Sequence, residues 1–98
     1  MMFSWFDAKE EQHFGTTLAR FYIERVPFES PFSKNKFATK TQETLKKLDL
    51  QVQQFKKDRR LNVYKKAKLG NAFKWSLRDA GYDVDYVNEL TEWLMLRV

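Results

Sequence analysis

The chain has 98 residues, of which 43% are hydrophobic and 16% aromatic, and its formal net charge at pH 7 is +5. This length suffices for one domain with one core but not for two, and the aromatic content excludes an intrinsically disordered chain. The chain contains no cysteine, which excludes disulfides, thiolate metal sites and cysteine nucleophiles. We therefore predict a single folded domain over residues 1–98.

The first predicted helix begins after Ser4, which can cap it, with Asp7 three residues later as a capping-box acid. Gly15 lies inside the helical pattern, where it can mark the close approach of another helix. Pro27 ends the segment because it lacks a backbone N–H and restricts the residue before it. The apolar stripe of this helix consists of Phe14, Leu18 and Phe21, with Tyr22 beside it.

Residues 27–36 are predicted to form a loop, because two prolines lie in a stretch rich in turn-forming residues. Phe28 and Phe32 each follow a proline directly. Their rings favour a loop that is pinned to the core over a free linker.

A second helix is predicted from about Thr39 to about Lys57, because apolar residues recur there at spacings of three and four. This seam is too short for a coiled coil and favours a core face in a helical bundle. A β-hairpin spanning Leu48 to Val63 is the competing interpretation, but the stretch has no hairpin turn residues and many helix formers. The seam consists of Leu45, Leu48, Val52 and Phe55.

A third helix is predicted over roughly residues 60–80. The sequence leaves open whether it continues the second helix, because no helix breaker separates the two. One apolar stripe consists of Leu69, Phe73, Leu77 and Ala80, and a different side carries Leu61, Tyr64, Lys68 and Trp75.

Gly81 is predicted to end the third helix, with Tyr82 as the hydrophobic residue after it and Asp83 as the N-cap of a fourth helix over about residues 84–97. The core face of the fourth helix would consist of Val87, Leu90 and Leu94. The predicted fold is a small all-α bundle of four or five helices, in which a short turn containing Gly81 joins the third helix to the fourth.

Charge is distributed unevenly along the chain. Residues 34–78 hold fourteen Lys and Arg residues against three acids, a formal charge of +11, whereas residues 1–33 carry −2 and residues 79–98 carry −4. Such a field acts on binding partners more than on the fold. The predicted basic binding face comprises Lys46, Lys47, Lys56, Lys57, Arg59, Arg60, Lys65, Lys66 and Lys68.

We expect a non-enzymatic binding or adaptor protein that acts through this basic face. Nucleic acid is one candidate ligand, with phosphates on the lysines and arginines and bases stacked on Tyr64 or Trp75. An acidic protein partner is the other candidate. The alternative to a binding face is that the lysines are simply solvated and the aromatic rings fill the core.

Catalytic and metal motifs find little support in the sequence. His13 is the only histidine, and neither a nucleophile elbow nor a phosphate-binding loop is present. Glu10 and His13 share a helix face, but a bundle metal site needs a second such pair, which only a dimer could supply. Asp83 and Asp85 lack the glycine and the final glutamate of a calcium loop. We therefore expect no enzyme activity, no cofactor and no metal.

The predicted helix after Gly81 is relevant to the choice of binding partner. It is too acidic to enter the major groove, so an antiparallel helix hairpin is favoured over a helix-turn-helix motif. Its apolar end, residues 94–98, is expected to dock in the core, or alternatively to form a homo-oligomer interface.

No apolar run is long enough to span a bilayer, and the acids near the N-terminus argue against a secretory signal. We therefore expect a cytoplasmic protein.

Overall fold

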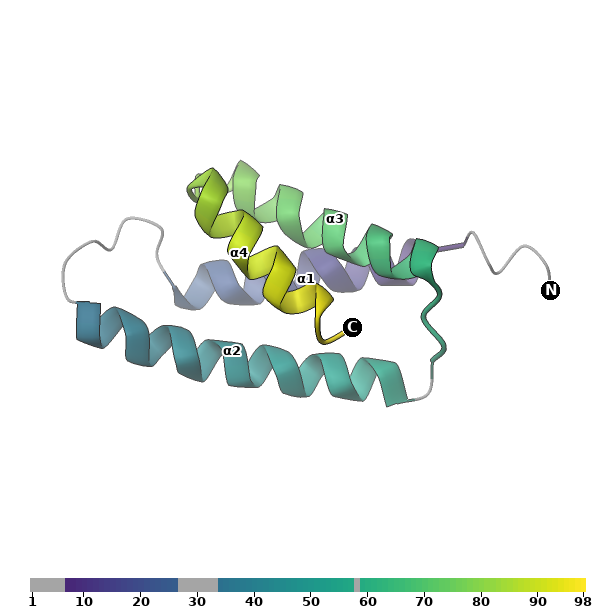
Figure 1. Ribbon diagram of the computed structural model, residues 1–98, viewed down its shortest axis with the longest axis horizontal. Helices are drawn as coiled ribbons and strands as arrows, with labels where there is room; N and C mark the ends of the chain where they lie inside the picture. Colours follow the sequence, from purple (N-terminus) through teal and green to yellow (C-terminus); the bar gives the residue numbers. More distant parts are fainter. Residues whose placement is uncertain (1–6, 27–33, 58) are drawn as a thin grey trace.

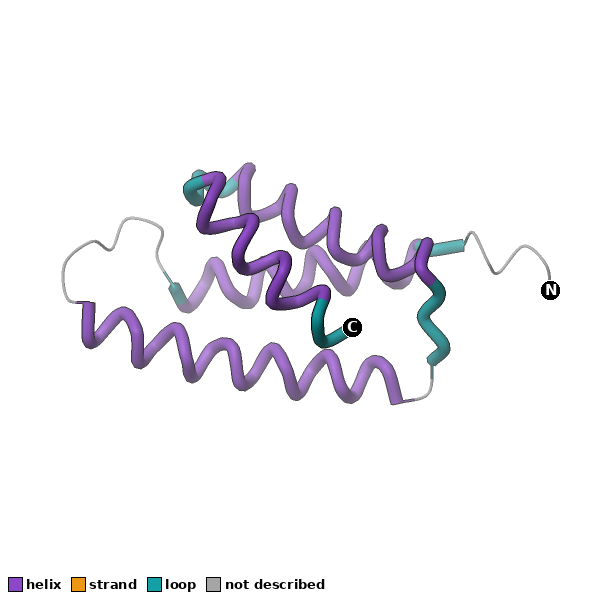
Figure 2. The backbone as a smooth tube through the Cα atoms, in the orientation of Figure 1, coloured by secondary structure: helices purple, strands orange, loops and turns teal. Residues whose placement is uncertain are grey.

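The computed structural model describes residues 7–26, 34–57 and 59–98, with the side chains of residues 34–40 excepted. This part of the chain forms four helices and no strand, as Figure 2 shows. The all-α prediction is thus confirmed for the described residues, which contain no fifth helix. The helices are α1 (Lys9–Arg25), α2 (Lys34–Lys57), α3 (Val63–Asp79) and α4 (Val84–Met95).

The molecule is elongated, with principal extents of 51 × 24 × 19 Å. Helix α1 packs against both α2 and α3, and α4 folds back against α3 (Figure 1). The start of α1, the end of α2 and the start of α3 lie at the same end of the long axis, whereas the α3–α4 turn lies toward the other end (Figure 1). This arrangement decides where the charged segments of the chain meet.

The core is built from the stripes that helical spacing predicts on α2, α3 and α4. On α1 the buried face is centred on Leu18 and Tyr22, whereas Phe14 and Phe21 are only partly buried, so the predicted stripe was one residue off centre. No helix in the described residues is long and apolar enough to cross a membrane. The side chains with no exposed surface include Leu18, Tyr22, Leu48, Val52, Leu69, Phe73, Leu77, Val87 and Leu94.

The predicted start of α1 was wrong. The helix begins at Lys9, and the residue before it, Ala8, makes no side-chain capping hydrogen bond. Asp7 accepts a hydrogen bond from the backbone N–H of Lys9 at 3.4 Å. Ser4 lies outside the described residues. A capping sequence favours a helix start but does not enforce one, because packing against other helices supplies most of a helix's stability.

The predicted boundary between the loop and α2 also needs correction. Helix α2 begins at Lys34, earlier than the expected Thr39, so the last three residues of the predicted 27–36 loop are helical. The segment from Lys34 onward contains no breaker, and the preceding Pro31 is the last residue that restricts the backbone. The remainder of the predicted loop, including Phe28 and Phe32, lies outside the described residues.

α2 and α3 are separate helices, which answers the question that the sequence left open. The hairpin alternative is wrong, because Leu48 lies inside α2 and Val63 opens α3. Asn62 caps α3, since its side-chain oxygen accepts a hydrogen bond from the backbone N–H of Lys65 at 2.8 Å. Asparagine is a favoured N-cap residue, so the sequence carried a signal for this start that the prediction from residue 60 missed.

The connection from α3 to α4 has the hydrogen bonds of a Schellman motif. Gly81 has a φ of 101° and donates its N–H to the carbonyl of Arg78 at 3.0 Å, while the N–H of Tyr82 reaches the carbonyl of Leu77 at 3.3 Å. The Asp83 carboxylate then accepts hydrogen bonds from two backbone N–H groups in the first turn of α4. These contacts reverse the chain within a few residues and set α4 against α3.

Candidate nucleic-acid interface

The outer face of α3 carries a row of aromatic and cationic side chains. Trp75 is 53% exposed, and the Lys74 ammonium and the Arg78 guanidinium lie 5.7 Å and 5.2 Å from the centre of its ring. About two turns before Trp75, the Lys68 ammonium lies 5.4 Å from the centre of the Tyr64 ring. Residues 64, 68, 75 and 78 follow helical spacing, so the row runs for about 21 Å along α3.

The row faces away from the core. The opposite side of α3 is formed by Leu69, Phe73 and Leu77, all without exposed surface. The structure therefore confirms that Tyr64 and Trp75 lie on a different side of the helix from the apolar stripe. Because Trp75 is half exposed, its ring does not fill a core, which was the alternative to a binding role for this residue.

One end of the molecule gathers cations from three helices. The N-termini of α1 and α3 meet the C-terminus of α2 there (Figure 1), so the helix dipoles place two partial positive charges and one partial negative charge at this end. Asp83 and Asp85, which begin α4, lie toward the other end. The cations of the basic end are Lys9, Lys56, Lys57, Arg59, Arg60, Lys65, Lys66 and Lys68.

The structure divides the predicted basic face between two surfaces. Lys46, Lys47 and Lys57 are exposed on α2, pointing away from its buried seam as expected. Helix α1 packs against both α2 and α3, so Lys46 and Lys47 on α2 belong to a different helix from the α3 row, and Lys46 lines a groove with Trp93 and Arg97. Lys65, Lys66 and Lys68 are partly buried on α3, and Arg60 is exposed in the connection between α2 and α3.

Two of the predicted phosphate-binding cations already have partners within the chain. The Lys56 ammonium donates a hydrogen bond to the Arg97 carbonyl at 2.8 Å. Arg59 pairs with the Glu10 carboxylate, and its guanidinium carbon lies 4.3 Å from the centre of the Phe55 ring. A phosphate would have to displace these contacts, so both residues are weaker candidates than the exposed cations.

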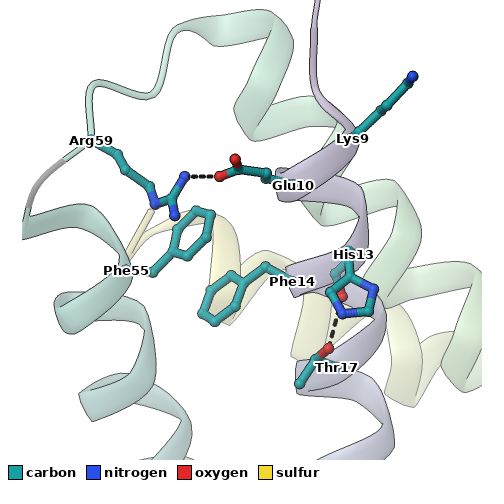
Figure 3. Close-up of a pocket in the computed structure, with 7 residues that line it drawn as sticks. All are labelled: Lys9, Glu10, His13, Phe14, Thr17, Phe55 and Arg59. Carbon is teal, nitrogen blue, oxygen red and sulfur yellow. Dashed lines mark hydrogen bonds and ion pairs between the residues drawn. The ribbon is translucent and has the colours of Figure 1, made fainter.

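Sequence reasoning missed a cleft between α1 and α2 at the basic end (Figure 3). Phe14 and Phe55 meet there face to face, with ring centres 4.0 Å apart and planes 3° apart. The cleft is widely open to solvent and has a volume of about 620 Å³. Phe14 and Phe55 were assigned only to apolar stripes, and nothing in either stripe indicates that the two rings end at an opening. The lining residues are Lys9, Glu10, His13, Phe14, Thr17, Phe55 and Arg59.

Glu10 and His13 both lie at this cleft, so the predicted sharing of a helix face holds. The described residues contain no group of three or more His, Cys, Asp or Glu side chains close enough to hold a metal ion. The Glu10 carboxylate instead pairs with Arg59. The backbone carbonyl of His13 accepts a hydrogen bond from the Thr17 hydroxyl at 2.9 Å.

A cluster of three tyrosines joins α1 to α4 in the core. The hydroxyls of Tyr22 and Tyr86 hydrogen-bond to each other, and the Tyr82 hydroxyl donates to the carbonyl of Val26. Burial raises the pKa of Tyr22 and Tyr82 far above the usual value, and the hydrogen bond to Tyr86 raises that of Tyr22 further. Burial also raises the pKa of Tyr86. These tyrosine hydroxyls therefore serve the fold, because their oxygens form hydrogen bonds within the molecule.

Comparisons with protein-family models, curated proteins and solved structures give no match for this chain. The candidate interface is therefore defined by the side chains of α3 and by the charges of the basic end alone.

Proposed function

We propose that this chain is a non-enzymatic binding protein whose ligand is single-stranded nucleic acid. The observation that carries the proposal is the half-exposed Trp75 ring between Lys74 and Arg78 on the outer face of α3. Proteins that bind single strands without reading their sequence combine aromatic rings, on which bases stack, with cations that contact the backbone phosphates. The row on α3 offers both in alternation.

The basic end extends this surface. Arg60 is exposed just before α3, and Lys65 and Lys68 follow in its first turns. A strand that stacks on Trp75 and Tyr64 would run along α3 toward these cations. In this proposal the four helices form a bundle, the short Gly81 turn holds α4 against the inner side of α3, and the outer side is left for the ligand.

Fluorescence anisotropy of a labelled oligothymidylate tests the proposal. Trp75→Ala should weaken binding roughly 5- to 150-fold, because stacking of one base on an aromatic ring contributes about 1–3 kcal/mol. Leu50→Ala is the matched control, since Leu50 is a large apolar side chain that is 64% exposed on α2. It should leave the affinity unchanged.

A second pair of variants separates the two basic surfaces. Lys68→Glu combined with Lys74→Glu should abolish binding, whereas Lys46→Glu combined with Lys47→Glu, which makes the same charge change on α2, should reduce affinity only slightly. Equal losses from both pairs would mean that net charge alone drives binding. If the chain instead binds an acidic protein and no oligonucleotide, the ligand proposed here is wrong.

A further inference from the structure

Asn71 occupies the middle of the outer face of α3. It lies seven residues after Tyr64 and four residues before Trp75, so helical spacing places it in the same row as the two rings. The burial pattern agrees, because Asn71 is exposed, whereas Leu69 and Phe73 on either side of it have no exposed surface. A strand that stacks on both rings would therefore pass over the Asn71 side chain.

The fold does not account for an asparagine at this position. Asparagine is one of the weaker helix formers, because its side chain competes for backbone hydrogen bonds. Residue 71 lies well inside α3, so it caps neither end, and its side chain makes no hydrogen bond to any other residue that the structure describes. The neighbouring Gly70, by contrast, packs beneath the side chain of Met95. A residue that works against its helix and supports no contact in the fold is typical of a functional position.

The position of Asn71 along the helix suits a base next to the one on Trp75. At about 1.5 Å per residue, the two residues lie about 6 Å apart along the helix axis. Bases stacked on each other in one strand lie only about 3.4 Å apart, so the neighbouring base reaches Asn71 when it is turned out of the stack. Proteins read single strands in this form, with some bases stacked on rings and others hydrogen-bonded at their edges.

The amide of Asn71 carries a hydrogen-bond donor and an acceptor side by side. Adenine presents the matching pair, because its N6 amino group donates and its N7 accepts, and asparagine contacts both atoms at once. The Asn71 NH₂ group would donate to N7, and its carbonyl oxygen would accept from N6. Thymine presents an acceptor and a methyl group in their place, so it cannot form this pair.

We propose that Asn71 is a specificity-determining residue that reads one adenine in the strand bound along α3. This inference rests on the proposed function and adds a base preference to it. The neighbouring cations Lys68 and Lys74 contact phosphates, which position a strand without distinguishing its bases. The ligand is thus a single strand in which an adenine lies next to the base stacked on Trp75.

Competition binding with four strands of equal length tests this preference. One strand is an oligothymidylate, and the others carry adenine, cytosine or guanine at the central position. The adenine strand should bind about tenfold more tightly than the oligothymidylate, which is within the discrimination expected of a bidentate contact. The guanine strand controls for stacking, because guanine has the same double ring but presents two acceptors at N7 and O6. It should bind more weakly than the adenine strand.

Two matched variants localise the preference. Asn71→Ala should remove the preference for adenine and leave the affinity for oligothymidylate unchanged. Because alanine is the better helix former, this variant should be at least as helical and as thermally stable as the parent. Asn88→Ala is the control, since Asn88 is also exposed but lies on α4, and it should keep the full preference.

The outcomes separate this inference from the proposed function. If the unmodified protein binds all four strands equally, or if Asn71→Ala keeps the preference for adenine, the role of Asn71 is overturned while strand binding on α3 stands. Equal loss of the preference in Asn71→Ala and Asn88→Ala would also contradict a contact at residue 71. If no strand binds at low salt, the proposed function and the role of Asn71 fall together.

Discussion

Gly15 of α1 lies directly against the backbone of Leu69 in α3, so that a Cβ at residue 15 would overlap the Leu69 carbonyl oxygen. The Cβ of Ala72, on the next turn of α3, would be 3.1 Å away. This contact explains why a glycine stands in the middle of a helix, where it costs stability relative to alanine. It confirms the prediction that Gly15 marks the close approach of another helix.

Gly15→Ala should therefore destabilise the protein by about 1–3 kcal/mol, because the clash is with backbone and not with a movable side chain. The thermal midpoint should fall by at least about 4 °C. Gly70→Ala is the matched control on α3. A Cβ there would meet the sulfur of Met95 at 2.5 Å, and that flexible side chain can move aside, so the midpoint should change little. Equal midpoints for the two variants would contradict the close packing of α1 on α3.

Gly81→Val should cost about 1–3 kcal/mol of stability, because a φ of 101° is strongly unfavourable for a β-branched residue. Gly81→Asn should cost less, since asparagine tolerates positive φ better than other non-glycine residues. Chemical denaturation of the three proteins measures this order. A Val variant as stable as the parent would show that residue 81 does not hold this conformation.

The tyrosine cluster should make the fold sensitive to alkali. Because folding raises the pKa of Tyr22, Tyr82 and Tyr86, the stability that they contribute is fully present below the usual tyrosine pKa of about 10 and is lost as the pH rises above it. Tyrosinate absorbance and helical signal should therefore change together in an alkaline titration. Tyr82→Phe should reduce the slope of stability against pH above about pH 10. Full ionisation of the tyrosines with the helices intact would exclude this coupling.

Deleting residues 93–98 should unfold the chain. Leu94 has no exposed surface and Val98 is only 7% exposed, and the Lys56 ammonium holds the Arg97 carbonyl. Loss of Leu94 and Val98 together should cost several kcal/mol of burial, out of a total stability of about 5–15 kcal/mol. Circular dichroism and light scattering distinguish the outcomes. A truncated chain that stays folded but changes from dimer to monomer would make this end an oligomer interface.

Helical spacing predicted the fold well where a helix has one buried face. Leu48 and Val52 on α2, and Leu69, Phe73 and Leu77 on α3, are all fully buried as their spacing indicates. Helix starts were predicted less well, because a start depends on which backbone N–H groups find acceptors and packing partners. Asn62 was a readable signal for α3, whereas Ala8 at the start of α1 gives none.

The candidate site was predictable only in part. The exposure of Trp75 follows from its place opposite the α3 stripe, but its contacts with Lys74 and Arg78 depend on side-chain conformation. The separation of Lys46 and Lys47 from the α3 row depends on how α2 and α3 pack against α1, and sequence periodicity does not encode this. The pairing of Arg59 with Glu10 joins residues far apart in the chain, and no local pattern indicates it.

The most direct test of the proposed function is the affinity of the unmodified protein for a single-stranded oligothymidylate across a series of salt concentrations. We predict measurable binding at low salt and a log–log slope of affinity against salt of about −0.7 for each phosphate contacted, because each contact releases a condensed counterion. The absence of binding at low salt, or an affinity that does not change with salt, would contradict the proposal.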